Sequence, residues 1–403
     1  MTDSKNIKHQ KTGTITTNNQ TNTKADTALD ATRRGLLGGV GFGIAATALA
    51  ACGGSNDASA SDDKKAPAVI RKKRKLTMVT TWPKGLPGLY TAAERLAVRV
   101  KELTEGSLDI SVFGAGELSP ALQAFDDVAS GAADMYHGAE YYWQSKSPAF
   151  SFFTAVPMGM TANEIMGWID FGGGQKLWEE LSNQYGVIAF QGANTGQQMG
   201  GWFRKEINTL DDFKGLKMRM PGLGGQVIRE LGGSAETIAG GEIYQALQTG
   251  QIDATEWVGP WNDLALGFYQ QAEYYYGPGF HEPGSSLACG MNLKVWESLT
   301  PIEQAAIRAA CNEANHLSLG EFTYQNAMSL KTLTEEHAVK LRTFSPEVLT
   351  RMDEISKDVR SQAGSGGDLE KRIYESFESA LAASSLWGNV ADGPFLNSRS
   401  KRS

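Results

Sequence analysis

The same helix–glycine–strand plan occurs twice in this chain, and this repetition limits the possible folds more than any other feature. One copy occupies residues 122–135 and the other residues 243–254, and in both an aspartate stands three positions after the glycine that ends the helix. Each strand then runs into an aromatic segment. Ligands bind beyond the carboxyl ends of strands in open parallel sheets, so two such ends facing each other would form a cleft between two lobes. The plan is common in α/β proteins, and alone it supports the cleft only weakly.

Strand and helix patterns also alternate at the start of the folded part. Residues 76–80 are typical of a strand, and residues 108–112 alternate apolar with polar side chains. Between them, apolar residues mark one face of a helix, which Gly106 is suited to end. Strand, helix and strand in this order predict a right-handed parallel crossover. About 330 residues follow the N-terminal segment, too many for one ordinary core, so we expect an α/β fold with two lobes.

The chain turns helical from Thr300 onward. Thr300 and Glu303 fit a capping box, and Ser345 precedes a second helix pattern. Glycines at 364–367 break that pattern, and Asp368 is suited to cap a last helix. This helix has an apolar residue every four positions, which predicts a stripe that covers another surface. The stripe consists of Leu369, Ile373, Phe377 and Leu381.

The N-terminus has the features of an export signal. Thr32–Leu37 contains a twin-arginine pair, and a weakly apolar run at 38–51 follows it. The run has about 14 residues, fewer than the about 20 that a spanning helix needs. It ends in Leu-Ala-Ala before Cys52, a pattern that resembles a bacterial lipoprotein box. We therefore expect residues 1–51 to be a signal, Cys52 to carry lipid, and residues 52–75 to be a flexible tether.

These signals predict a periplasmic protein anchored by lipid at the outer face of the cytoplasmic membrane. Cleavage without lipidation is the alternative for Cys52, and the signal leaves inner and outer membrane anchoring open. Five positive residues at 71–75 either attract anionic lipid headgroups or simply precede the first strand in solvent. The net charge of −7 argues against nucleic acid as a partner.

The two cysteines of the folded part are Cys289 and Cys311. They could form one disulfide in an oxidising compartment. Cys311 falls on the apolar side of a helix pattern, and Cys289 lies among small residues in a strand-like run. This placement favours two buried free thiols.

Three short patches carry the chemistry. Residues 198–203, 218–222 and 254–260 each place a polar or charged side chain among glycines and aromatics, where a strand pattern ends. Arginine offers a rigid two-pronged donor that suits a carboxylate. A glutamate, a glutamine and a main-chain carbonyl provide oxygen ligands for a hard cation. The patches therefore predict a site that holds a small organic anion together with a metal ion.

These patches also carry a family resemblance. Asn194–Lys205, Gly215–Arg219 and the pair Glu256–Trp257 resemble the extracytoplasmic solute receptors of tripartite ATP-independent periplasmic (TRAP) transporters. The likeness is greatest to the branch that binds 2-oxo or 2-hydroxy monocarboxylates such as pyruvate and lactate, and Thr81–Gly88 is similar to that branch too. The resemblance extends from Leu76 to the C-terminus.

The resemblance implies a two-lobed periplasmic-binding-protein fold with an inter-lobe cleft and long C-terminal helices. Residues 76–363 would form the two interleaved α/β lobes, and residues 364–403 a C-terminal helix and tail. In the resembled branch this helix reaches onto a second subunit, which implies a homodimer, whereas packing on its own lobe is the alternative. The closed receptor would deliver its ligand to a TRAP membrane permease driven by an ion gradient.

The resemblance also assigns roles to residues that bind the acid. Arg219 matches the arginine that grips the substrate carboxylate, and Gln198 matches a residue that touches both substrate and cation. Tyr141 or Tyr142 would supply a hydroxyl from the first lobe, with the choice between them open. Trp257 would contact the substrate.

For the cation, sodium or calcium, the resemblance implies four ligands. They are Gln198, the carboxylate of Glu256, the main-chain carbonyl of Trp257 and a polar group from Glu282. Two glutamates tilt the expectation toward a divalent ion.

Two other functions compete with a transport receptor. Twin-arginine export often serves redox enzymes, but the histidines show no paired metal spacing, no Cys-x-x-Cys is present, and no complete nucleotide loop or nucleophile motif is found. We therefore do not expect an enzyme. An exported ligand sensor for a signalling partner would use the same cleft.

Overall fold

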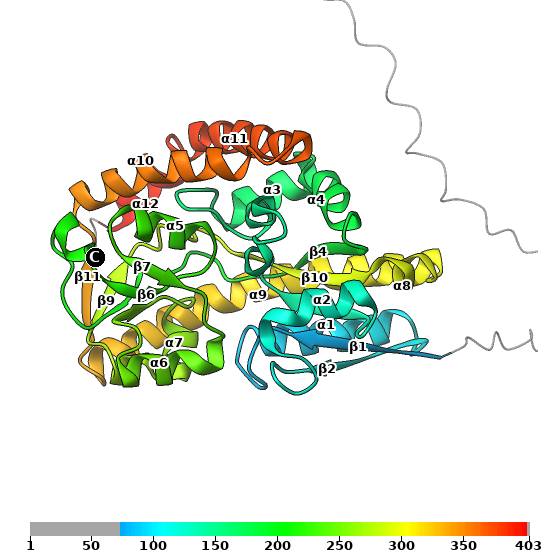
Figure 1. Ribbon diagram of the computed structural model, residues 1–403. Coiled ribbons are helices and arrows are strands. Elements are labelled where there is room, and N and C mark those ends of the chain that lie inside the picture. Colours follow the sequence, from blue (N-terminus) through cyan, green and yellow to red (C-terminus); the bar gives the residue numbers. More distant parts are fainter. Residues whose placement is uncertain (1–72, 401–403) are drawn as a thin grey trace, which may run out of the picture. The chain divides into compact units, whose positions relative to one another are not determined.

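The structure is a computed structural model, and it describes residues 73–400 (Figure 1). The predictions for the signal, for Cys52 and for most of the tether lie outside the described residues. Within residues 73–400, every helix is too short or too polar to cross a membrane.

The first sheet forms the centre of what we call lobe A. Its strands lie in the order β2-β1-β3-β10-β4, with β1 parallel to β2 and β3, and β10 antiparallel to β3 and β4. Helix α1 connects β1 to β2, so the predicted parallel crossover is confirmed. The bounds are β1 Arg74–Thr80, α1 Tyr90–Leu103, β2 Leu108–Phe113, β3 Met135–Gly138, β4 Val187–Asn194 and β10 Ser286–Asn292.

The second sheet forms the centre of lobe B. Its order is β11-β9-β5-β8-β6-β7, with β6 parallel to β7 and β8, and β5 antiparallel to β8 and β9. The mixed α/β architecture with two lobes agrees with the predicted fold class. The bounds are β5 Gly201–Phe203, β6 Lys217–Arg219, β7 Ser234–Glu236, β8 Ala254–Thr255, β9 Tyr274–Gly277 and β11 Lys340–Thr343.

Three segments connect the two sheets. Residues 195–200 lead from β4 to β5, residues 278–285 return from β9 to β10, and the long helix α9, Pro301–Glu335, leads from lobe A to β11. Helix α9 packs on β4 and α1 in lobe A and on α7, Pro260–Leu266, in lobe B, as Figure 1 shows. The two lobes are therefore interleaved in sequence.

The repeat found in the sequence has the same structure in both lobes. Helix α2, Ala124–Ser130, leads to β3, and α6, Ile243–Thr249, leads to β8; each helix ends at a glycine in the left-handed region. Asp134 Oδ2 accepts a hydrogen bond from the Thr77 main-chain N–H at 2.8 Å, and Asp253 Oδ2 accepts one from Lys217 N–H at 3.1 Å. Thus the shared aspartate ties each strand to its parallel neighbour, and the two strand ends are equivalent.

The C-terminal helices α10, Pro346–Ala363, and α11, Asp368–Gly388, run beside each other over both lobes (Figure 1), and α12, Asp392–Ser400, follows. The capping box at Thr300 and Glu303 and the cap at Ser345 are confirmed. The cap of α11 is Gly367, with Asp368 as the first helical residue.

The apolar stripe of α11 packs on its own lobe. Leu369, Ile373 and Phe377 are buried, and Leu381 is partly buried against the same core. The Phe377 ring lies 5.1 Å from the Phe152 ring and 5.2 Å from the Trp168 ring, between centroids. The prediction that this stripe forms a dimer contact was therefore wrong, because its burial attaches α11 to lobe A.

The remaining helices complete the two lobes, and the cysteines lie inside lobe A. Cys289 on β10 and Cys311 on α9 are buried and free, as the sequence favoured. The other helical bounds are α3 Ala162–Phe171, α4 Gly174–Asn183, α5 Gly222–Glu230 and α8 Leu293–Glu297, with short 3-10 segments at η2 Glu140–Trp143 and η5 Gly240–Glu242.

Candidate functional site

Arg219 is the last residue of β6 and has a side chain only 1% exposed. Its Nε donates to the Ile238 carbonyl at 3.2 Å, and its Nη1 donates to the Glu256 main-chain carbonyl at 3.1 Å and to the Glu256 carboxylate. Nη2 donates to the Tyr142 hydroxyl at 3.3 Å, and the guanidinium carbon lies 5.0 Å from the Trp257 ring centroid. Backbone contacts and an aromatic face therefore fix the plane of the guanidinium.

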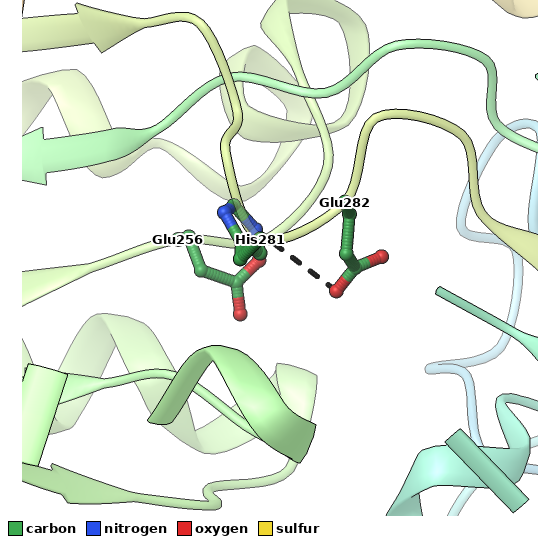
Figure 2. Close-up of side chains that lie close together, drawn as sticks. All are labelled: Glu256, His281 and Glu282. Carbon is green, nitrogen blue, oxygen red and sulfur yellow. Dashed lines mark hydrogen bonds and ion pairs between the residues drawn. The ribbon is translucent and has the colours of Figure 1, made fainter. Parts of the chain in front are cut away.

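Beside Arg219, three buried titratable side chains meet (Figure 2). His281 Nε2 lies 3.1 Å from Glu256 Oε2 and 3.9 Å from Glu282 Oε1. Gln198 donates from Nε2 to Glu282 Oε2 at 2.8 Å. Among the residues that the structure describes, Gln198 Oε1 and His281 Nδ1 belong to the buried polar atoms without a protein partner.

The electrostatics of this cluster favour an added positive charge. The pKa of Glu282 is raised to about 7, chiefly by burial and next by the charge of Glu256, while His281 and Ser285 partly oppose the rise. Burial lowers the pKa of His281, but Glu256 outweighs burial, and the net shift is upward. Two carboxylates and an orphaned amide oxygen in one buried place form a donor set that fits a hard cation.

The connecting segments between the lobes hold Gln198 and Glu282 together. The Gln198 N–H donates to the Glu282 carbonyl at 3.3 Å, and the Gly279 N–H donates to the Gln198 carbonyl at 2.9 Å. Thr195 N–H donates to the Ser285 carbonyl at 3.1 Å. A Cβ at Gly279 would lie 2.5 Å from the Gln198 oxygen, so only glycine allows this approach. The local backbone thus brings residues 84 positions apart into contact.

Lobe A contributes an aromatic face. Tyr141 and Tyr142 in η2 are perpendicular, with ring centroids 4.9 Å apart, and both point at the charged residues of lobe B. The Tyr142 hydroxyl oxygen accepts a hydrogen bond from Arg219, whereas the charge of Glu282 helps to raise the pKa of Tyr141 after burial, the largest cause. The Trp82 indole N–H donates to His137 Nδ1 at 2.8 Å, and its ring meets the Trp257 ring edge-on at 6.1 Å.

Every described residue that the sequence assigned to the site lies in this one place. These residues are Gln198, Arg219, Glu256, Trp257 and Glu282 with both tyrosines, and Cys52 lies outside the described residues. Sequence reasoning missed His281, because it looked for paired histidine spacing. Its position directly before Glu282 was the available signal.

Comparison with known proteins identifies the family. The model of bacterial extracellular solute-binding proteins, family 7, matches residues 78–364. A monocarboxylate 2-oxoacid-binding periplasmic protein from Nostoc sp. is 39% identical over 91% of this chain and 98% of its own length.

Solved structures agree with this assignment. A TRAP periplasmic solute-binding protein from Pseudoalteromonas atlantica, with bound sodium and pyruvate, is 39% identical and has a TM-score of 0.78, covering 81% of this chain and 99% of its own. A TRAP solute-binding protein from Bordetella bronchiseptica is 35% identical, with a TM-score of 0.80 over 82% of this chain and 98% of its own. It is a mixed-occupancy dimer with calcium and picolinate in one site. The protein belongs to family 7 of the bacterial extracellular solute-binding proteins, the receptors of TRAP transporters, which bind solutes and are not enzymes.

Proposed function

We propose that this receptor binds a small 2-oxo or 2-hydroxy monocarboxylate, such as pyruvate or lactate, together with a metal cation. The observation that carries the proposal is the buried guanidinium of Arg219, held by backbone carbonyls beside the Glu256–His281–Glu282 cluster. The monocarboxylate 2-oxoacid-binding relative, and the solved relatives with pyruvate or picolinate and sodium or calcium, support the same ligand class.

The acid would lie between the lobes with its carboxylate on Arg219. The fork of an arginine forms two parallel hydrogen bonds with a carboxylate, and Tyr142 already reaches Arg219 from lobe A. Gln198 and Tyr141 would contact the remaining polar atoms of the acid. Trp257 and Trp82 would cover its apolar part, because the ring of Trp82 in lobe A already meets the ring of Trp257 in lobe B.

Four groups would hold the cation. They are the carboxylates of Glu256 and Glu282, the orphaned amide oxygen of Gln198 and the main-chain carbonyl of Trp257. When bound, the cation supplies positive charge that both carboxylates and an acid oxygen can share. The chemistry of the donors accepts sodium or calcium, and two glutamates favour a divalent ion.

Ligand binding would favour the closed arrangement of the lobes. An acid that touches Arg219 in lobe B and Tyr142 in lobe A stabilises only the form in which both are near. The closed receptor would then dock on a TRAP permease, and lipid on Cys52 would keep it at the membrane.

Native mass spectrometry of the purified protein tests the binding proposal directly. The expected spectrum contains the protein with one small organic acid and one cation per chain, and calorimetry then gives the affinity for pyruvate with calcium or sodium. Failure of every 2-oxo and 2-hydroxy monocarboxylate to bind in the presence of either cation would contradict the proposal.

We also propose a homodimer, on a different surface from the one expected from the sequence. The end of α11 and the residues after it expose large apolar side chains, of which Leu386, Trp387 and Val390 are 69%, 68% and 71% exposed. Exposed apolar patches that are rimmed by polar residues mark contacts between proteins. The dimeric relative from Bordetella bronchiseptica supports a second copy as the occupant.

A further inference from the structure

We propose that the Arg219–Glu256 ion pair is an internal lock that makes the acid and the cation bind only together. The acid displaces Glu256 from Arg219 and pairs with Arg219 itself. The cation then pairs with the displaced carboxylate of Glu256, so each ligand replaces a partner that the other removes. This inference rests on the proposed function and concerns the regulation of the same site.

The geometry shows which contacts can be exchanged. Two of the hydrogen bonds of Arg219 go to main-chain carbonyls, of Ile238 and Glu256, and these hold the side chain in place. The contacts that a carboxylate ligand can replace are the Glu256 carboxylate and the Tyr142 hydroxyl. An acid that uses both prongs of Arg219 must therefore displace the carboxylate of Glu256.

Both carboxylate oxygens of Glu256 already have a partner, so the loss of Arg219 leaves one of them without a positive charge beside it. Its Oε1 accepts from Arg219 and its Oε2 lies 3.1 Å from His281 Nε2. The side chain is 0% exposed, so solvent does not reach it. Loss of Arg219 would leave Glu256 facing the second carboxylate, Glu282, with only His281 between them.

Each ligand alone therefore strands a buried charge. The acid alone leaves Glu256 without its cationic partner, and the cation alone leaves Arg219 without an anion, since its remaining partners are main-chain carbonyls and a hydroxyl. A buried charge that loses its partner is strongly destabilising, whereas a complete set of partners is not. With both ligands present, every charge has an opposite one.

The lock predicts gains of affinity on removing either partner. Glu256→Gln leaves Arg219 free, so pyruvate should bind at least about tenfold more tightly than it does to the wild type when both are measured in sodium-free buffer with a calcium chelator. Arg219→Met leaves Glu256 free, so calcium without acid should bind at least about tenfold more tightly than to the wild type. A site in which the cation merely bridges to the acid predicts no gain in either case.

Glu282→Gln is the matched control. It removes the same charge from the same cluster, but Glu282 has no hydrogen bond to Arg219 among those of the described residues. Pyruvate without cation should bind Glu282→Gln within about threefold of its wild-type affinity. An equal gain in Glu282→Gln and Glu256→Gln would show a general effect of charge and overturn the lock.

Calorimetry on the wild type and the three variants, with thermal melting to verify folding, completes the test. Gains for pyruvate in Glu256→Gln and for calcium in Arg219→Met support the lock. Absence of the gain in either folded variant overturns it. Each variant tests the lock by itself, so one folded variant is sufficient if the other fails to fold. Wild-type binding of pyruvate with calcium distinguishes this result from failure of the proposed function.

Discussion

Arg219 shows how one residue can be ready for a ligand before the ligand arrives. The main-chain carbonyls of Ile238 and Glu256 and the ring of Trp257 fix its guanidinium, which loses little freedom when it binds a carboxylate. A lysine would keep the charge but not the fork. We therefore expect the proposed specificity for a planar carboxylate to depend on this one side chain.

Replacing Arg219 by methionine should weaken pyruvate binding in the presence of calcium by about 30-fold or more. Removing one partner of a desolvated charge pair costs about 2–5 kcal/mol, and each 1.4 kcal/mol is about tenfold in affinity. Calorimetry measures the change, with Arg229→Met as the control, because Arg229 is exposed and its Nη1 donates to the Ala235 carbonyl, away from the site. Wild-type affinity in Arg219→Met would contradict the proposed site.

Glu140, next to the two tyrosines, should make stability depend on pH. Burial raises its pKa from 4.5 to about 8, although the Tyr136 hydroxyl, 2.6 Å from Oε1, opposes the rise. Between these values the folded protein keeps a proton that the unfolded chain has lost, so stability is full below pH 4.5 and falls as the pH rises toward 8. The loss between pH 5 and pH 8 is on the order of 4 kcal/mol.

Urea unfolding in chelator at several pH values measures this dependence. Glu140→Gln should be less sensitive to pH in this range, because glutamine does not ionise, and the exposed Glu230→Gln should behave as the wild type. A profile of the same slope in Glu140→Gln and the wild type would show that Glu140 is not the group responsible.

Individual site residues were predicted to different degrees. Arg219, Glu256 and Gln198 belong to motifs that follow one another in the same order as in the resembled family. That common order predicts that the three residues lie in one site. His281 has no such motif, and its role depends on the distance to Glu256, which two separate connections determine. The two tyrosines could not be separated in the sequence because a short 3-10 segment turns both toward lobe B.

At the scale of elements, local signals predicted where helices begin better than what they pack against. The capping box of α9 depends on residues three positions apart, so the sequence contains the whole interaction. The α11 stripe packs against Phe152 and Trp168, more than 200 positions away in the sequence. Periodicity alone contains no information about these partners. At the end of α1, Gly106, with φ 76°, is left-handed as its place after the helix suggested, and Glu105, with φ 51°, is left-handed too, which no sequence signal indicated.

The exposed end of α11 allows a test of the dimer that leaves the core intact. Leu386→Glu with Trp387→Glu should give monomers, since the two side chains are about 70% exposed and their loss should not disturb the fold. Phe171→Glu on α3, at a position 93% exposed, is the control and should remain dimeric. Sedimentation at micromolar concentration distinguishes the states, and a monomeric wild type would contradict the proposal.

At the scale of the whole molecule, the alternation of strands and helices predicted an α/β fold, and the repeat predicted two equivalent strand ends. The prediction that the lobes are interleaved depended on the resemblance. No local pattern in the sequence shows that β9 belongs to lobe B and β10 to lobe A. Pairing across the sheet decides this, and such pairing is a property of the complete chain.

The N-terminal signals predict where the molecule works. Replacing Arg33 and Arg34 by lysine should retain precursor in the cytoplasm, because the export machinery reads the arginine pair. Cys52→Ala should release soluble protein, because it removes the proposed site of the lipid. Fractionation with an antibody to the receptor measures both, and membrane retention of Cys52→Ala would exclude the lipid anchor.

Gln198 and Glu282 lie on two of the three segments that connect the two sheets, and their backbones are hydrogen-bonded to each other. When the lobes separate, Tyr142 must leave Arg219, but these two side chains can stay together, since neither belongs to a moving body. An opened receptor would thus retain part of its cation site at the pivot itself. A cation bound there would limit the angles through which the lobes can rotate about the connecting segments. The acid, in contrast, would be held only while the lobes are closed.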